Sequence, residues 1–209
     1  MRLRRRYAVP LCLVAALLFA VLFGRIFTRA PRPRNVLLIT LDTMRADRLP
    51  VYGFSGIDTP ALDRIATEGA VFEEAYAAVP LTLPSHSSMF TGIYPPRLGV
   101  RDNAGAPLSN EFTTLAEALR ARHLKTAAFI ASAVVAPGRG LDQGFDLYSA
   151  GPPVTCSGAP PARRRAGEVV DEALSWLAGH DADPFFAWIH LFDTHRPYDL
   201  PDDYKDRHY

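Results

Sequence analysis

The chain has 209 residues, of which 48% are hydrophobic, 22% charged and 11% aromatic, and this composition excludes a disordered or collagen-like chain. The length fits one domain, with room for a small second one. The formal net charge of +1 is unevenly distributed, because residues 1–34 hold eight arginines and no acid, whereas residues 35–209 hold 15 basic and 22 acidic residues. An acidic body argues against nucleic acid as a partner. Cys12 and Cys156 cannot build a disulfide framework, and no zinc-type spacing of Cys and His is present.

Residues 7–24 form an uncharged apolar stretch with four arginines on each side. Its eighteen residues just suffice for a helix across a hydrocarbon core of about 30 Å. A buried amphipathic helix is disfavoured because the stretch has no polar face. A cleavable signal peptide is the alternative, but no good small-x-small cleavage site follows. We therefore expect residues 1–34 to form a basic start, a single transmembrane anchor and a Pro/Arg spacer. The body would then lie on the periplasmic or extracellular side.

Predicted strands and helices alternate along residues 35–209. In chain order they are a strand at 35–41, a helix at 59–69, a short strand near 71–77, a helix at 113–123, a strand at 125–131, an exposed loop at 150–165, a helix at 166–179 and a strand at 184–191. This alternation predicts an α/β fold with a mixed, mostly parallel sheet covered by helices on both faces. Ligands bind at the carboxyl ends of the strands in such folds.

Two of these predictions rest on clear local signals. The run at 35–41 is apolar and rich in β-branched residues, which is typical of a strand buried on both faces. For the helix at 59–69, Thr59 is the expected N-cap, Pro60 takes the first helical position and Gly69 ends it. Its apolar residues 62, 65 and 66 are expected to lie on one face of the helix.

Asp42 and Thr82 are candidate functional residues because of where they lie in this pattern. Asp42 follows the first strand directly, where α/β folds place metal ligands, although an Asp there also commonly caps a helix. Pro84 is expected to start a helix, which leaves Thr82 just before the first turn and beside its free N–H groups. That environment suits an anionic tetrahedral group, but Thr82 or Ser85 could also act only as a helix cap.

A third group of polar residues, His190 to His195, lies at the end of the last predicted strand. His190 has the alternation of a strand residue and could be a core histidine. His195 lies in the following loop and is the better candidate for a site residue.

Five ordered blocks of the sequence resemble the sulfatase family of the alkaline phosphatase superfamily. The blocks are residues 35–53, 59–69, 83–95, 144–148 and 184–198. The resemblance implies an alkaline-phosphatase-like fold, and it makes the chain the N-terminal part of a metal-dependent enzyme acting on sulfate or phosphate esters.

The resemblance also implies roles for individual residues. Asp42 corresponds to a ligand of a divalent cation (Ca, Mg, Mn or Zn), with Thr43 as a weaker ligand where the family often has a second Asp. Thr82 corresponds to the nucleophile and would also touch the metal. Asn103 resembles the amide that holds a non-bridging oxygen. His195 resembles the histidine that contacts the transferred group, and His86 is a candidate substrate-binding residue.

The sequence departs from the family pattern at two places. The nucleophile motif is Cys or Ser, then x-Pro-x-Arg, whereas residues 82–86 are Thr-Leu-Pro-Ser-His, and Thr cannot mature to formylglycine. Thr82 instead matches the direct Thr nucleophile of superfamily phosphodiesterases and phosphotransferases, which favours phosphate over sulfate. The family's later Asp-His-Gly or Asp-Asn-Gly segment is also missing, so we expect a C-terminally truncated domain whose partner is its missing C-terminal half. The expected substrate is a small-molecule, lipid or glycan ester. The alternative is a non-catalytic binding or scaffold module of the cell envelope.

Overall fold

The computed structural model describes residues 35–150 and 164–198. The chain divides into two units, Met1–Arg34 and Asn35–Tyr209. The predicted anchor at 7–24 lies outside the described residues, so it stays a prediction. None of the helices within the described ranges is long and apolar enough to cross a membrane.

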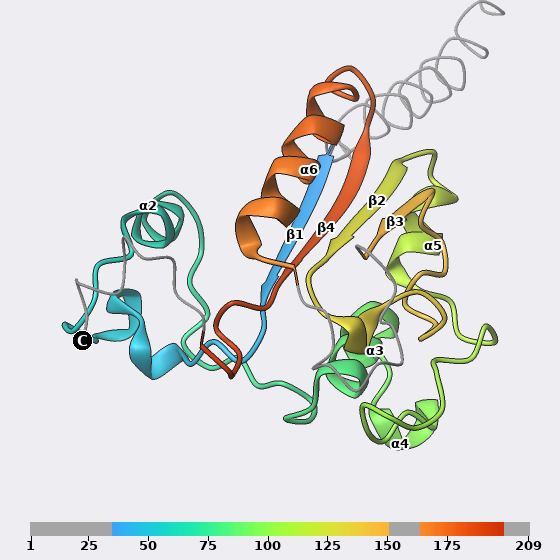
Figure 1. Ribbon diagram of the computed structural model, residues 1–209, viewed down its shortest axis with the longest axis horizontal. Helices are drawn as coiled ribbons and strands as arrows, with labels where there is room; N and C mark the ends of the chain where they lie inside the picture. The colour runs from blue at the N-terminus through green and yellow to red at the C-terminus, as the bar shows by residue number, and fades with distance from the viewer. Residues whose placement is uncertain (1–34, 151–163, 199–209) are drawn as a thin grey trace, which may run out of the picture. The chain divides into compact units, whose positions relative to one another are not determined.

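Four parallel strands form the sheet of the body, in the order β1-β4-β2-β3 (Figure 1). The strands are β1 (Asn35–Leu41), β2 (Lys125–Ile130), β3 (Leu147–Ser149) and β4 (Phe185–Leu191). The first and last strands along the described chain are therefore neighbours, with Leu38 opposite Trp188 and Thr40 opposite His190. The predicted strands at 35–41, 125–131 and 184–191 are confirmed within one residue, and the pairs observed are all parallel.

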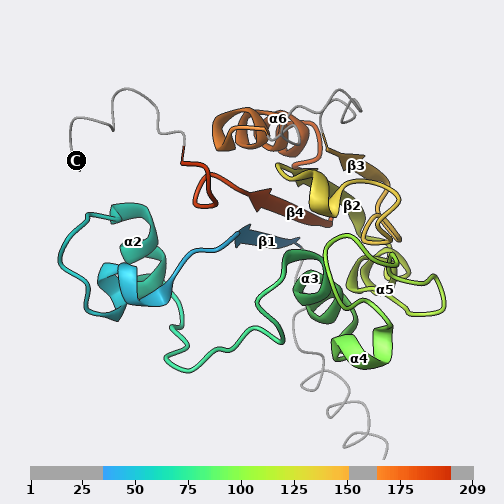
Figure 2. The same cartoon turned by 60° about the horizontal axis from the view of Figure 1, so that its bottom comes forward.

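Helices cover both faces of this sheet, as the sequence predicted (Figure 2). On one face lies α6 (Ala166–Ala178). On the other lie α3 (Thr82–Thr91), α4 (Pro95–Leu98) and α5 (Leu115–Arg120). Helix α5 is shorter than the predicted 113–123 because a capping box of Thr114 and Glu117 starts it, with the Thr114 hydroxyl accepting from the Glu117 N–H at 3.1 Å.

The alternation of strand residues builds one hydrophobic cluster on each face of the sheet. Toward α3, Phe186 and Trp188 of β4 pack with Phe90, whose ring centroid lies 4.6 Å from that of Trp188. Toward α6, Phe129 and Ile189 pack with Val169 and Ala173. Successive strand side chains point to opposite faces, so residues on β1 and β4 that share a register share a face.

Strand β1 is covered on only one face. Leu37 and Ile39 pair in register with Ala187 and Ile189 and so belong to the α6 face, yet they remain 49% and 48% exposed. Helix α6 packs against β4 and β2 and leaves this part of the sheet uncovered. The expectation that β1 is buried on both faces was therefore wrong among the described residues.

Helix α2 (Pro60–Glu68) lies apart from the sheet, beside the short 3-10 helices Ala46–Arg48 and Pro50–Tyr52 (Figures 1 and 2). The predicted helix is confirmed, including Pro60 at its first turn, but none of its residues is buried, and Ile65 is 63% exposed. The helical spacing of its apolar residues was correct, and the face that they share does not pack into the core.

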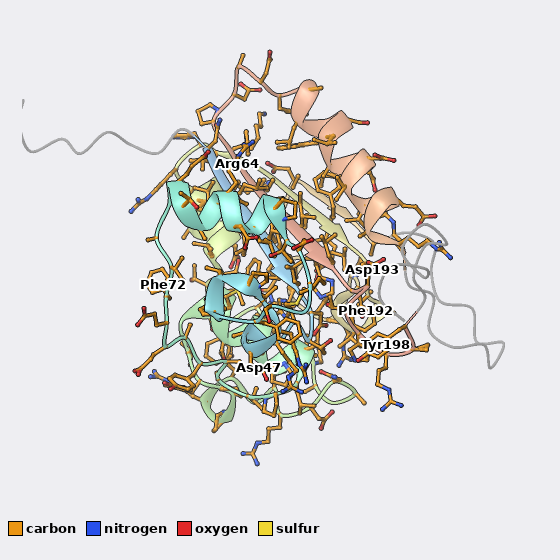
Figure 3. The ribbon with its side chains drawn as sticks, turned by 90° about the vertical axis from the view of Figure 1, so that its left-hand side faces the viewer. Asp47, Arg64, Phe72, Phe192, Asp193 and Tyr198 are labelled. Atoms are coloured by element: carbon orange, nitrogen blue, oxygen red, sulfur yellow. The ribbon has the colours of Figure 1, made fainter. Side chains whose placement is uncertain are left out.

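No strand forms at 71–77. Residues 71–78 are exposed and irregular, and Phe72 is 73% exposed on the side of the molecule that faces the viewer in Figure 3. The apolar and aromatic residues of this segment have no neighbouring strand to pair with, so the prediction of a strand there was wrong. The segment instead leads into α3 through Leu81, whose backbone is extended.

Candidate active site

Asp42 lies at the carboxyl end of β1, where the sequence placed it. Its N–H donates to the Leu191 carbonyl at 2.9 Å, so the pairing of β1 with β4 continues one residue beyond the strand. The side chain is 9% exposed. The backbone of Asp42 is therefore fixed at the carboxyl end of the parallel sheet, and its side chain is nearly buried there.

Thr82 is the first residue of α3, and its hydroxyl donates to Asp42 Oδ2 at 3.1 Å. The sequence predicted a helix starting at Pro84 with Thr82 outside it. The helix in fact begins two residues earlier, and Leu81 is the N-cap without a side-chain hydrogen bond. Proline is tolerated throughout the first turn because its missing N–H would have no helical partner there. Thr82 therefore lies in the first turn of the helix, at the positive end of the helix dipole.

Asn103 comes to the same turn from a loop twenty residues further along the chain. Its Oδ1 accepts a hydrogen bond from the Leu83 N–H at 2.9 Å. Its own backbone carbonyl accepts from Arg139 Nη2 at 2.6 Å. Because the amide oxygen faces Leu83, the amide NH₂ is the part of Asn103 that remains able to donate. The predicted contact with a substrate oxygen stays a prediction.

His190 is the residue whose place at this site the sequence did not predict. It is fully buried, as expected for a core histidine, but its Nε2 lies 3.5 Å from Asp42 Oδ2. Neither ring nitrogen makes a hydrogen bond of normal geometry within the described residues. The register of β1 and β4, with Thr40 opposite His190, places the ring beside the end of β1. Only the pairing of these two strands, 150 residues apart, could have indicated it.

The electrostatics of the site favour an ionised Asp42. Burial acts to raise the pKa of the Asp42 carboxyl, but His190, the Thr82 hydroxyl and His86 together lower it by more, so the pKa lies below its usual value. Asp42 therefore stays a carboxylate near neutral pH and accepts hydrogen bonds rather than donating them.

His86 lies one turn after Thr82, facing the sheet. Its Nδ1 lies 2.8 Å from the Thr82 carbonyl oxygen and its Nε2 lies 3.3 Å from Thr40 Oγ1. Burial lowers its pKa to about 4, with a smaller contribution from the charge of His190. Both nitrogens of this neutral ring have partners within the protein. In this structure neither ring nitrogen of His86 points to a substrate, because each bonds to the protein, and the predicted substrate contact of His86 stays a prediction.

The loops after β1 and β4 are tied together at Asp42. Thr194 Oγ1 donates to the Asp42 carbonyl, and Thr43 Oγ1 donates to the Thr194 carbonyl at 3.0 Å. Thr43 has a left-handed backbone, with φ of 59°, and is exposed. Its hydroxyl is turned to the neighbouring loop, so its predicted role as a weaker metal ligand stays untested.

His195 follows Thr194 directly and is thereby held near this end of the sheet. Its ring stacks on Phe192 with centroids 4.2 Å apart, and its Nδ1 lies 2.6 Å from the Arg196 carbonyl oxygen. Phe192, Asp193 and Tyr198 of the same loop lie together in Figure 3. The predicted contact of His195 with a transferred group stays a prediction.

Asp42 and Thr82 together supply the kind of donors that a hard divalent cation prefers. The carboxylate oxygen and the hydroxyl lie 3.1 Å apart and are both nearly buried. Such cations usually take six or more oxygen ligands. Within 35–150 and 164–198, no group of three or more His, Cys, Asp or Glu side chains could hold a metal ion. Asp42 and Thr82 therefore fit part of a cation site.

A cavity of about 470 Å³ lies along another side of α3, and neither Asp42 nor Thr82 lines it. Its lining residues are Tyr76, Ala77, Ala78, Ser85, Ser88, Met89, Gly92, Ile93 and Tyr94. The candidate active site is instead the shallow group of polar residues at the ends of β1 and β4 and the start of α3.

These features define an α/β protein with a carboxylate at the carboxyl end of its first described strand and a hydroxyl at a facing helix N-terminus. The family model described as Sulfatase matches residues 34–209. The chain therefore belongs to the sulfatase family, as its ordered sequence blocks indicated.

Curated relatives match over short segments. N-acetylgalactosamine-6-sulfatase of Sus scrofa is 47% identical over 72 residues, which is 34% of this chain and 14% of that protein. Steryl-sulfatase of Mus musculus is 46% identical over 71 residues, 34% of this chain and 11% of the relative. An arylsulfatase of Clostridium perfringens is 51% identical over 59 residues, 28% of this chain and 12% of the relative. The matches thus span less than a fifth of these relatives' lengths.

Solved structures show the same fold over most of this chain. The phosphonate monoester hydrolase of Agrobacterium radiobacter matches with a TM-score of 0.67 and 25% identity, over 83% of this chain and 43% of its own. A structure in complex with D-glucosamine-2-N,6-O-disulfate as its substrate matches with a TM-score of 0.66 and 24% identity, over 79% and 35%. These likenesses confirm the alkaline-phosphatase-like α/β fold predicted from the sequence, and the chain spans less than half of each structure.

Proposed function

We propose that this protein hydrolyses phosphate or sulfate esters by direct attack of the Thr82 hydroxyl. The observation that carries the proposal is the hydrogen bond from Thr82 Oγ1 to Asp42 Oδ2 at the first residue of α3. It orients the hydroxyl at a helix start, where the positive end of the helix dipole favours an anionic group. Family membership and the likeness to a phosphonate monoester hydrolase support a reaction at phosphorus or sulfur.

The reaction would run in two displacements. Thr82 Oγ forms a bond to the phosphorus or sulfur atom and loses its proton, while the bond to the ester oxygen breaks and the leaving alkoxide takes up a proton. Water then displaces Thr82 and releases inorganic phosphate or sulfate. A divalent cation bound at Asp42 and Thr82 would lower the pKa of the hydroxyl and stabilise negative charge on the transferred group.

The other residues of the site would bind and orient the substrate. The NH₂ group of Asn103, turned away from Leu83, is available to donate to a non-bridging oxygen. His195, held next to the Asp42 backbone through Thr194, is the candidate donor for the leaving oxygen. The Thr residue at the nucleophile position cannot become formylglycine, and this favours phosphorus as the atom attacked.

Substitution of Thr82 tests the proposal in the full-length protein with divalent metal present. Thr82→Ala should abolish turnover of p-nitrophenyl phosphate, its diester or p-nitrophenyl sulfate. Thr82→Ser should retain a measurable fraction because it keeps a hydroxyl at the same position. Thr91→Ala is the matched control, since Thr91 is the last residue of the same helix and its hydroxyl bonds to nearby backbone, donating to the Ser87 carbonyl and accepting from the Ile93 N–H.

The chemistry of the intermediate gives a second readout. Quenching during turnover should leave a phosphoryl or sulfuryl group on the peptide that contains Thr82, detectable by mass spectrometry. Full activity of Thr82→Ala would contradict direct attack. If the wild-type protein turns over no ester but still binds sulfated or phosphorylated compounds, the non-catalytic binding module predicted as the alternative is correct.

We also propose that residues 7–24 anchor the protein in a membrane, with the body on the periplasmic or extracellular side. The support is the apolar stretch without a good cleavage site. The expressed protein should remain with membranes after high-salt washing and be released by detergent with residues 1–34 intact. Soluble protein whose N-terminus begins near Ala30 would instead show a cleaved signal peptide.

A further inference from the structure

Strand β1 contacts the start of α3 through two side chains, Thr40 and Asp42. Residues two apart on a strand point to the same face, and the hydrogen bonds of both side chains to α3 agree with this. Asp42 meets the Thr82 hydroxyl directly. Thr40 meets the side chain of His86, and His86 meets the Thr82 carbonyl. β1 and the residue that follows it thus hold Thr82 at two points: Asp42 bonds to its side chain, and Thr40 acts on its backbone carbonyl through His86.

The chemistry of the partners fixes the direction of each hydrogen bond in the second connection. The Thr82 carbonyl can only accept, so His86 Nδ1 carries the proton and donates to it at 2.8 Å. His86 is 6% exposed, and in a buried neutral ring the other nitrogen carries no proton. Nε2 therefore accepts from the Thr40 hydroxyl at 3.3 Å.

A fourth group fixes Thr40 in turn. The indole Nε1 of Trp188 can only donate, and it does so to Thr40 Oγ1 at 3.0 Å. The lone pair that accepts from Trp188 leaves the hydroxyl proton to point at His86. Trp188 itself is fully buried in the core between β4 and α3, so the chain of bonds begins at an immobile group. Only one placement of the protons satisfies all the hydrogen bonds in this chain, which runs from Trp188 through Thr40 and His86 to the Thr82 carbonyl.

We propose that His86, held by Thr40, is a positioning residue that fixes the first turn of α3 and with it the Thr82 hydroxyl. It does so without touching the substrate, because both of its ring nitrogens bond to protein. Loss of the Thr40 contact frees the ring to turn, and the Thr82 carbonyl loses its side-chain partner. The catalytic consequence rests on the proposed function of Thr82, whereas the bonding pattern of His86 does not.

Replacement of Thr40 tests the proposal at a distance from the substrate. In the full-length protein, Thr40→Val should lower kcat by roughly 10- to 100-fold, the range expected when a reacting group is displaced by a fraction of an ångström to one ångström, and should change KM little. Thr40→Ser should restore most of the turnover because it keeps the hydroxyl.

Thr126→Val is the matched control. The Thr126 hydroxyl, on β2, also makes two hydrogen bonds: it donates to the Gly144 carbonyl at 2.8 Å and accepts from the Asp146 N–H at 2.9 Å. Its loss costs the fold the same number of bonds but touches neither His86 nor Thr82. A kcat that is unchanged in Thr40→Val, or that falls equally in Thr126→Val, would overturn the proposal.

The proton position gives a readout that does not depend on activity. In a long-range ¹H–¹⁵N spectrum of the ¹⁵N-labelled full chain, the His86 ring should be protonated at Nδ1, with the signal assigned by its loss in His86→Asn. In Thr40→Val this pattern should be lost. A proton on Nε2 in the wild-type protein would refute the inference even if Thr82 is the nucleophile, whereas activity of Thr82→Ala would refute the proposed function and leave the His86 bonding pattern to this measurement.

Discussion

The hydroxyl of Thr82 donates to Oδ2 of Asp42 across 3.1 Å, although forty residues separate them in the sequence. Asp42 directly follows the first described strand of the sheet, and Thr82 begins a helix on the facing layer. By accepting this hydrogen bond, the ionised Asp42 carboxylate orients the lone pairs of the Thr82 hydroxyl oxygen. The two oxygens are also close enough to bind the same cation. The predictions for activity follow from this pair and from the side chains around it.

Asp42→Asn keeps the shape of the side chain and removes its charge. We expect weaker binding of divalent metal and a loss of activity that is partly recovered at higher metal concentration, because metal affinity depends on an anionic ligand. Titration of Mg²⁺, Ca²⁺, Mn²⁺ and Zn²⁺ against turnover measures this. The control is Asp47→Asn, an exposed carboxylate paired with Arg45, which should leave the metal dependence unchanged. An identical metal titration in Asp42→Asn and wild type would exclude Asp42 as a ligand.

Asn103 and His195 should affect the rate through charge stabilisation. Asn103→Ala and His195→Ala should each lower kcat by roughly 10² to 10³, the range for loss of one preorganised donor. Asn103→Asp separates the two functions of this side chain, since it keeps an oxygen for the Leu83 N–H but loses the NH₂ group. Its activity should fall as far as that of Asn103→Ala. Wild-type activity in Asn103→Asp would show that Asn103 acts only on the helix start.

The stability of the fold should depend on pH through His86. Its folded pKa of about 4 lies below the ordinary value of 6.5, so between these values the unfolded chain binds more protons than the folded one. The free energy of unfolding should therefore decrease as the pH falls from 6.5 toward 4, by about 3 kcal/mol at most. Asp42, whose pKa is also lowered, adds its loss of stability only below its ordinary value of 3.8.

Urea unfolding at several pH values, with a chelator present, measures this dependence. Other carboxylates add to acid destabilisation, so the informative quantity is the difference between wild type and His86→Asn. The variant should be less stable at neutral pH and should lose less stability between pH 6.5 and 4. Parallel pH curves for the two proteins would show that His86 is not a buried neutral histidine in solution.

The open face of β1 should promote self-association. Leu37 and Ile39 expose apolar side chains on an edge strand of the described sheet, and such surfaces associate in water. Leu37→Thr with Ile39→Thr should shift the sedimentation profile of the detergent-solubilised chain toward the monomer without lowering its unfolding temperature. Ile65→Thr on α2 is the control, because Ile65 is even more exposed than Leu37 and Ile39 but lies away from the sheet. An unchanged profile in the double variant would show that this face is not what associates.

The sequence by itself determined most helices and strands of the fold, their alternation, and the strand and helix ends at which the candidate functional residues lie. The apolar run at 35–41 indicated a strand, so Asp42 was expected at its carboxyl end, and helix signals placed Thr82 near a helix start. Family membership followed from the order of five blocks. These features depend on a few neighbouring residues, and local periodicity and turn chemistry therefore specify them.

Only the tertiary structure decided which of these residues meet. The segment at 71–77 has apolar and aromatic side chains but no strand beside it, and α2 has an apolar face but no sheet beneath it. A strand needs a hydrogen-bonded neighbour and a helix face needs a surface to cover, and neither is encoded in the segment itself. For the same reason, the sequence could not predict that His190 lies beside Asp42 or that Thr40 contacts His86. Those contacts exist because β1 pairs with β4 and α3 packs across both, and this arrangement is set by the whole chain.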